Sequence, residues 1–200
     1  SPPPNQLQKK YNEQGFFILQ DVAKGGLENV AKAAYRASTS EDPRPQMPED
    51  SVECQAARGP LKEMTRRVIW ALNKYRNDSR GHFRVTTRQA PSTWERAYDF
   101  RLYNQRQRGE ARETTRATYE SMPILCLLAL TPASLDVIKQ GTVTLLRGSA
   151  IILRGDTAYR HTGVQAGARQ AFYGVYLETT ATRRVRAAPA ANEQEQRGNW

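Results

Sequence analysis

Four apolar runs in the second half of the chain predict β-strands. They cover residues 124–130, 142–147, 149–154 and 171–177, they are rich in strand-forming residues, and glycine or proline separates most of them. We therefore expect this half to be built from β-structure. Eight side chains of these runs are expected to be buried between two sheets: Ile124, Leu125, Leu127, Leu145, Ile151, Leu153, Phe172 and Val175.

The first half of the chain mixes strand and helix patterns. Residues 15–19 form a short apolar run that predicts a buried strand. Apolar residues spaced i, i+3, i+4 and i+7 predict a helix over residues 27–37. The proline- and serine-rich residues 38–59 show no periodicity and predict a loop. A second helical stripe begins at Pro60 and continues to about Arg76.

Two shorter patterns follow the second helix. Weak alternation over residues 81–87 predicts a strand that ends before Pro91. Residues 92–95 have the S-x-x-E form of a capping box, which predicts the start of a helix. The inner face of that helix would carry Trp94, Ala97, Tyr98 and Leu102. Because the pattern is short, a strand is the alternative.

The length and composition fit one domain without disulfides or membrane spans. We expect a domain over residues 11–182, a flexible segment over 1–10 and a flexible tail over 183–200. No apolar run approaches the roughly 20 residues that span a bilayer. The two cysteines form no disulfide framework, and no secretory pattern opens the sequence. An intracellular, reducing compartment is therefore expected.

The positive charge is concentrated in the middle third of the sequence. The formal net charge is +10, and residues 58–116 hold 15 Lys+Arg against six Asp+Glu, a net of +9. Arginine dominates, and its planar guanidinium suits phosphates and carboxylates. Nucleic acid or an acidic protein surface is therefore a candidate partner, and a solvated basic face is the alternative. The candidate contacts are Arg66, Arg67, Arg106, Arg108, Arg112 and Arg116.

Candidate metal chemistry lies near the last strands. Residues 148–163 give a strand, a Gly-Asp turn and His161, and Arg169 follows eight residues later. This order resembles the Fe(II)/2-oxoglutarate-dependent dioxygenases, whose fold also opens with a pattern similar to residues 11–22. The resemblance implies an α+β chain: a double-stranded β-helix (jelly roll) built mainly from residues 119–180, with N-terminal supporting helices.

The resemblance also implies roles for two residues. His161 is similar to the second histidine ligand of the iron, at the opening of a strand, and Arg169 is similar to the residue that binds the far carboxylate of 2-oxoglutarate. Each residue also has a simpler interpretation. His161 would then be a structural histidine at a strand end, and Arg169 a surface arginine in a turn.

The rest of the expected iron site departs from the family pattern. The family's H-x-D/E motif belongs near residues 109–120, which contain no histidine. The only other histidine, His82, has no carboxylate two positions on. The carboxylates that could donate an oxygen are Glu110, Glu113 and Glu120. No catalytic residue is assigned, and Fe(II) and 2-oxoglutarate are expected only if the site is functional.

The sequence is therefore compatible with three functions. The first is a dioxygenase-fold protein with a degenerate iron site that serves as a basic binding or scaffold module. The second is an active oxygenase with an atypical metal site. The third is a jelly-roll structural protein, such as a capsid or ribonucleoprotein subunit. Iron content separates the second from the others.

Overall fold

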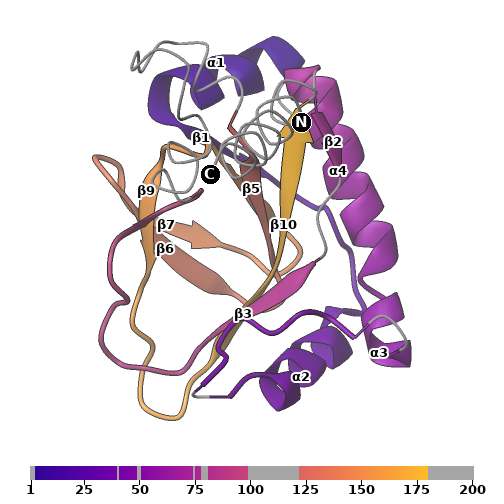
Figure 1. Cartoon of the computed structure of the whole chain (residues 1–200), viewed down its shortest axis with the longest axis vertical. Coiled ribbons are helices and arrows are strands. Elements are labelled where there is room, and N and C mark those ends of the chain that lie inside the picture. Colours follow the sequence, from indigo (N-terminus) through magenta and orange to yellow (C-terminus); the bar gives the residue numbers. More distant parts are fainter. Residues whose placement is uncertain are drawn as a thin grey trace, which may run out of the picture.

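Two antiparallel sheets face each other in the computed structural model, which describes residues 3–39, 41–48, 51–73, 75–77, 81–98 and 122–179 (Figure 1). The larger sheet has the spatial order β1 (Phe16–Leu19), β8 (Ala150–Leu153), β5 (Ile124–Ala129), β10 (Gln170–Thr179) and β2 (Tyr75–Asn77), and β3 (His82–Thr86) also pairs with β10. The smaller sheet has the order β4 (Glu95–Arg96), β9 (Ala158–His161), β6 (Ala133–Val137) and β7 (Gly141–Leu145).

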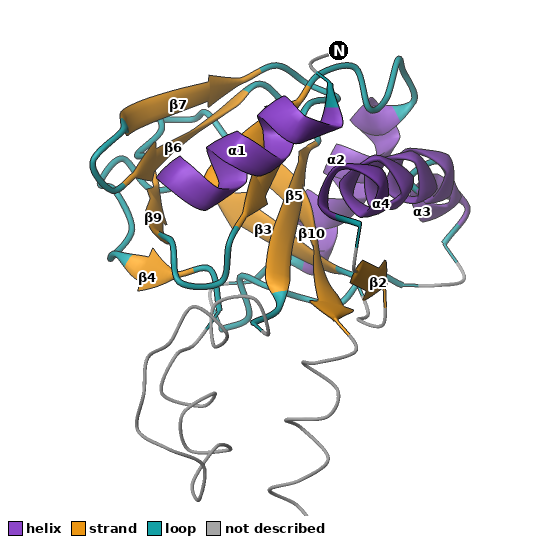
Figure 2. Cartoon of the chain, turned by 90° about the horizontal axis from the view of Figure 1, so that it is seen from above, coloured by secondary structure: helices purple, strands orange, loops and turns teal. Residues whose placement is uncertain are grey.

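Helices cover the outer face of the larger sheet. They are α1 (Pro4–Gln14), α2 (Leu27–Ala37), the short α3 (Val52–Gln55) and α4 (Arg58–Leu72). Figure 2 shows α2, α3 and α4 on one side of the strands β5 and β10, with β6, β7 and β9 on the other. Among the described residues, no helix has the length and apolar character needed to span a membrane.

The core has two layers, one on each face of the larger sheet. All eight side chains expected to be buried are buried. Six of them lie between the sheets: Leu125, Leu127, Leu145, Ile151, Leu153 and Phe172. The other two, Ile124 and Val175, pack with the helices on the outer face. The expectation that all eight lie between the sheets was therefore wrong for two, because successive strand residues point to opposite faces.

The predicted strands and helices are confirmed in their main parts, and the helix ends need correction. The second helix begins at Arg58 and ends at Leu72, four residues before the expected end at Arg76. Asn73 stops it by adopting a left-handed conformation with φ 54°, which asparagine tolerates better than most residues. Residues 75–77 then form β2 and pair with the end of β10.

Two expectations for irregular structure were also too broad. Residues 1–10 were expected to be flexible, but most of α1 lies there, and its Leu7 and Tyr11 are buried. The loop expected over residues 38–59 contains α3 and the start of α4. In each case a few buried side chains stabilise a short element that has little periodicity of its own. The tail over 183–200 lies outside the described residues.

The capping-box helix at Ser92 does not form. The described chain forms β4 at residues 95–96, which pairs with β9. The hydroxyl of Ser92 accepts a hydrogen bond from the backbone N–H of His161, at 2.9 Å, instead of capping a helix. Trp94 is 46% exposed, and the guanidinium of Arg160 lies 4.6 Å from its ring centroid.

The double-stranded β-helix begins earlier in the chain than expected. Both β3 and β4 precede residue 119, and each pairs with a strand near the end of the domain. The strands β6 and β9 were not predicted as separate runs. The resemblance implied that His161 begins a strand, but His161 is the last residue of β9. The fold thus closes through long-range pairing, which brings residues 82–96 beside residues 158–174.

Truncation of Leu153 tests the layer between the sheets. Leu153 is fully buried in β8, so Leu153→Ala should lower the free energy of unfolding by about 2–5 kcal/mol through lost transfer energy and the cavity left behind. Leu146→Ala is the matched control, because Leu146 is 69% exposed and its truncation should change stability by under about 0.5 kcal/mol. Urea denaturation measures both, and equal effects would contradict the assigned packing.

Candidate functional site

A buried arginine on β3, Arg84, forms hydrogen bonds with side chains from both sheets. The side chain of Arg84 is 3% exposed. Its Nε donates to His82 Nε2 at 2.9 Å, and its Nη2 donates to the Tyr176 hydroxyl at 3.3 Å. Its Nη1 donates to the Tyr159 hydroxyl and, at 3.4 Å, to Glu95 Oε1. All three guanidinium nitrogens therefore have partners, as a buried charge requires.

One carboxylate compensates two guanidinium groups in this cluster. Arg44 also donates to Glu95 Oε1, and it is more exposed than Arg84. Burial raises the pKa of Glu95, but the hydrogen bond and charge of Arg44, a hydrogen bond from Tyr159 and the charge of Arg84 outweigh it, so the pKa lies below its ordinary value. Glu95 is therefore ionised at neutral pH. Two cations and one anion leave the cluster with a formal charge of +1.

Both histidines of the chain face this cluster and are neutral. Burial, followed by the charges of Arg84 and Arg44, lowers the pKa of His82 and of His161 to about 3. His161 is 7% exposed, and its Nδ1 has no hydrogen-bond partner. Its ring packs against Tyr159 and Phe172, with centroid distances of 5.8 and 5.7 Å. His161 is thus a buried, neutral imidazole whose Nδ1 makes no hydrogen bond.

Gly174 makes room for the other imidazole. His82 and Gly174 are paired across β3 and β10, and a Cβ added to Gly174 would lie 2.8 Å from the His82 ring. The His82 ring stacks on Tyr176, with centroids 5.9 Å apart and an interplanar angle of 20°. The His82 ring can therefore occupy this position only because residue 174 is a glycine. The hydrogen bond between His82 and Arg84 depends on the same glycine.

The predicted cofactor residue, Arg169, lies apart from His161. It is exposed in the loop before β10, and its guanidinium lies 4.0 Å from the ring centroid of Tyr35 on α2. His161 faces the space between the sheets, whereas α2 covers the outer face of the larger sheet. The structure therefore does not bring Arg169 and His161 together. The arginine that does accompany His161 is Arg84.

Sequence reasoning missed Arg84, Glu95 and Arg44. One signal was present for Arg84: residues 82–86 alternate, and Phe83 and Val85 pack on the outer face, so Arg84 must point inward. The local sequence gives no sign that an arginine would be tolerated there. Its partners Tyr159 and Tyr176 lie 75 and 92 positions further along the chain.

The described residues hold no complete set of metal ligands. Within residues 3–98 and 122–179, allowing for their gaps, no group of three or more His, Cys, Asp or Glu side chains could hold a metal ion. Glu95, the carboxylate of the cluster around Arg84, already binds two guanidinium groups. Burial, and after it the charges of the same cations, lower the pKa of both imidazoles, and the cations would repel Fe(II). The carboxylates Glu110, Glu113 and Glu120 lie outside the described residues.

The candidate polyanion contacts are only partly described. Arg66 and Arg67 lie on α4: Arg66 forms an ion pair with Glu63 at 2.7 Å, and Arg67 Nη1 donates to the backbone oxygen of Gln20 at 2.7 Å. The other four, Arg106, Arg108, Arg112 and Arg116, lie outside the described residues. Binding of nucleic acid or an acidic protein at these six residues stays a prediction.

Comparison with solved structures identifies the fold. The chain is similar to the non-heme α-ketoglutarate-dependent epimerase SnoN from nogalamycin biosynthesis, with a TM-score of 0.60 and 8% identity over 88% of this chain and 80% of that one. A prolyl-4-hydroxylase from Pseudomonas putida matches with a TM-score of 0.55 and 11% identity, over 89% and 96% of the two chains. AviO1 from Streptomyces viridochromogenes matches with a TM-score of 0.60 and 10% identity, over 90% and 97%.

These similarities confirm the expected architecture. The chain has the double-stranded β-helix fold of the iron- and 2-oxoglutarate-dependent oxygenases, with helices on the outer face of the larger sheet. No protein-family model and no curated protein matches the sequence. At 8–11% identity the similarity extends to the fold, so the chemistry of this chain must be argued from its own residues.

Proposed function

We propose that this chain is a non-catalytic member of the oxygenase fold that serves as a binding or scaffold module. The observation that carries the proposal is the buried Arg84 beside His161, with its charge shared by Glu95 and the hydroxyls of Tyr159 and Tyr176. An iron site needs ligands that are negative or neutral and open toward the metal. Here a fixed cation lies beside the imidazole that resembles the iron ligand, and it interacts with the nearby carboxylate.

The electrostatics of the cluster support this proposal. The negative charge of Glu95 already compensates two arginines, both of which donate to its Oε1, so a metal at this carboxylate would compete with both cations for that charge. Binding Fe(II) at Glu95 would remove compensation from the buried Arg84, and an uncompensated buried charge costs several kcal/mol. The cluster therefore favours its own internal ion pairs over a metal.

A turnover assay tests the proposal. Protein purified without chelator is supplied with Fe(II), ascorbate and 2-oxoglutarate, and release of CO2 and succinate is measured for the wild type and for His161→Ala. We expect the two proteins to show the same background, at the level of free Fe(II). Decarboxylation well above background that His161→Ala abolishes would overturn the proposal in favour of an active oxygenase with an atypical metal site.

A further inference from the structure

Residues 42–48 run along the edge of β3 that faces away from β10. The amide of Phe83 donates to the backbone oxygen of Pro45 at 2.8 Å, and the amide of Met47 donates to the backbone oxygen of Gly81 at 3.2 Å. The side chain of Met47 packs against the apolar core on the outer face of the larger sheet. The segment thus adds one short stretch of pairing to this sheet.

The same segment also reaches the smaller sheet. Arg44 forms an ion pair with Glu95 of β4, the outermost described strand of that sheet. The buried Arg84 donates to the same oxygen of Glu95, at 3.4 Å. Arg44 is 44% exposed, so it lies on the solvent side of the cluster around Arg84. The segment therefore joins an edge of one sheet to an edge of the other, at the end where the cluster lies.

The attachment of this segment is weaker than that of the core strands. Its three prolines, Pro43, Pro45 and Pro48, have no N–H to donate, so the pairing with β3 cannot extend into a full ladder. The ion pair between Arg44 and Glu95 is partly exposed, and pairs of this kind contribute little to stability. By contrast, β5 and β10 pair over six consecutive residues inside the larger sheet.

We propose that residues 42–48 form a strap that detaches while both sheets stay folded, and that its detachment controls access to the cluster around Arg84. Detachment breaks the two backbone hydrogen bonds at the β3 edge and the ion pair between Arg44 and Glu95. Segments with few buried contacts open at a lower free energy than core strands do. The inference goes beyond the proposed function, because it holds whether or not the cluster binds a metal.

Hydrogen exchange followed by NMR tests whether the strap opens by itself. The amides of Phe83 and Met47 report on the strap, and the amides within the β5–β10 pairing report on the core. We expect the strap amides to exchange at least about tenfold faster than the core amides. Their exchange should also respond little to low concentrations of urea, because detachment of the strap exposes little surface. Strap exchange that rises with urea as steeply as core exchange would overturn the inference, since the strap would then open only with the whole domain.

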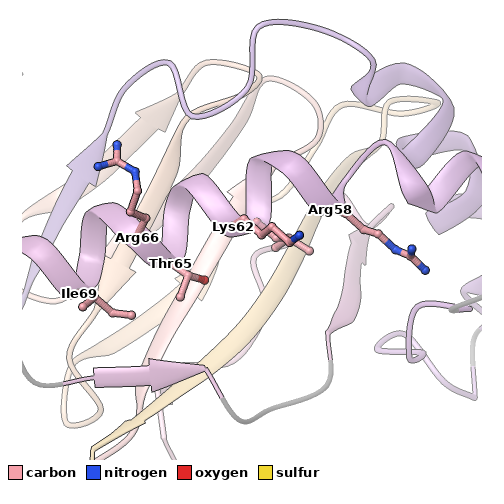
Figure 3. Close-up of a pocket in the computed structure, with 6 residues that line it drawn as sticks. Arg58, Lys62, Thr65, Arg66 and Ile69 are labelled. Atoms are coloured by element: carbon pink, nitrogen blue, oxygen red, sulfur yellow. The ribbon is translucent and has the colours of Figure 1, made fainter.

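Removal of the ion pair should favour the detached strap. Arg44→Met keeps an unbranched side chain, and we expect it to speed exchange of the Phe83 and Met47 amides about fivefold. Arg66→Met is the matched control: Arg66, shown on α4 in Figure 3, pairs with Glu63 of the same helix, and that pair stays intact when the strap detaches. Its strap amides should exchange within about twofold of the wild type. Equal rates in the two variants would contradict the proposal.

Chemical modification tests whether detachment uncovers the cluster. His82 and His161 are the only histidines of the sequence, and both face the cluster, so histidine modification reports on this place alone. The folded protein is treated with diethyl pyrocarbonate at pH 7, and mass spectrometry measures the rate at each histidine. We expect Arg44→Met to speed both reactions about fivefold, and Arg66→Met to leave them within about twofold of the wild type.

Two results of the modification experiment would overturn the control of access. One is a wild type whose histidines react as fast as the histidine of an unstructured peptide, because the cluster would then be uncovered already. The other is a pair of variants, Arg44→Met and Arg66→Met, whose histidines react at the same rate. Neither measurement involves iron or 2-oxoglutarate, so failure here is distinguishable from failure of the non-catalytic proposal.

Discussion

Replacing Glu95 with glutamine is expected to lower the free energy of unfolding by about 3 kcal/mol at pH 7. The reason is Arg84, whose nearly buried guanidinium loses the charge that compensates it, while the shape of the side chain at position 95 is kept. Removing one partner of a buried ion pair costs about 3–5 kcal/mol, and the partial exposure of Glu95 places the expectation at the lower end. Urea denaturation measures the change.

A double-mutant cycle assigns that cost to Arg84. Arg84→Met removes the buried cation and keeps an unbranched chain of similar length. In the Arg84→Met background, Glu95→Gln should cost less than about half of what it costs in the wild type, because the remaining pair with Arg44 is more exposed. Additive costs of the two substitutions would show that Glu95 does not stabilise Arg84, and would remove the basis for treating the cluster as one unit.

The second large effect is acid destabilisation between pH 6 and pH 5. Burial and the nearby arginines lower the folded-state pKa of His82 and His161 to about 3, whereas an unfolded histidine titrates near 6.5. The unfolded state therefore binds more protons in this window, and stability falls as the pH falls. Two histidines give a loss of about 2 kcal/mol per pH unit, a large part of the roughly 5–15 kcal/mol of a typical domain.

Single substitutions divide this effect between the two histidines. His161→Asn and His82→Gln should each remove about half of the slope of unfolding free energy against pH between 6 and 5, whatever they do to stability at pH 7. Glu95 also has a lowered pKa, but its stabilising charge is lost only below its ordinary pKa of 4.5, outside this window. A slope that neither substitution changes would mean that the imidazoles are not held neutral in the folded state.

Continuous apolar runs were the most informative part of the sequence. β5, β8 and β10 were predicted because their residues are apolar on both faces, which fits strands covered by helices on one side and a second sheet on the other. β6 was missed because its buried Ala133, Leu135 and Val137 alternate with half-buried polar residues over only five positions. Short strands of this kind are stabilised by their neighbours more than by their own composition.

The candidate site was less accessible to sequence reasoning than the fold. His161 was found because its position after a glycine-bounded strand resembles a known pattern. Arg84 was not found, because an arginine is buried only where distant partners compensate it, and these partners come from β4, β9 and β10. Ser92 was misread for a similar reason: its hydroxyl bonds to the backbone of His161, 69 positions away, instead of capping a local helix.

Equilibrium dialysis against Fe(II) under anaerobic conditions is the most direct test of the central claim that the cluster around Arg84 excludes a catalytic metal. The wild type and His161→Ala are dialysed at pH 7 with 2-oxoglutarate present, and bound iron is measured per chain. We predict that the two proteins retain the same substoichiometric amount, because His161 faces two guanidinium groups and a carboxylate already in use. Retention of about one iron per chain by the wild type, lost in His161→Ala, would contradict the claim.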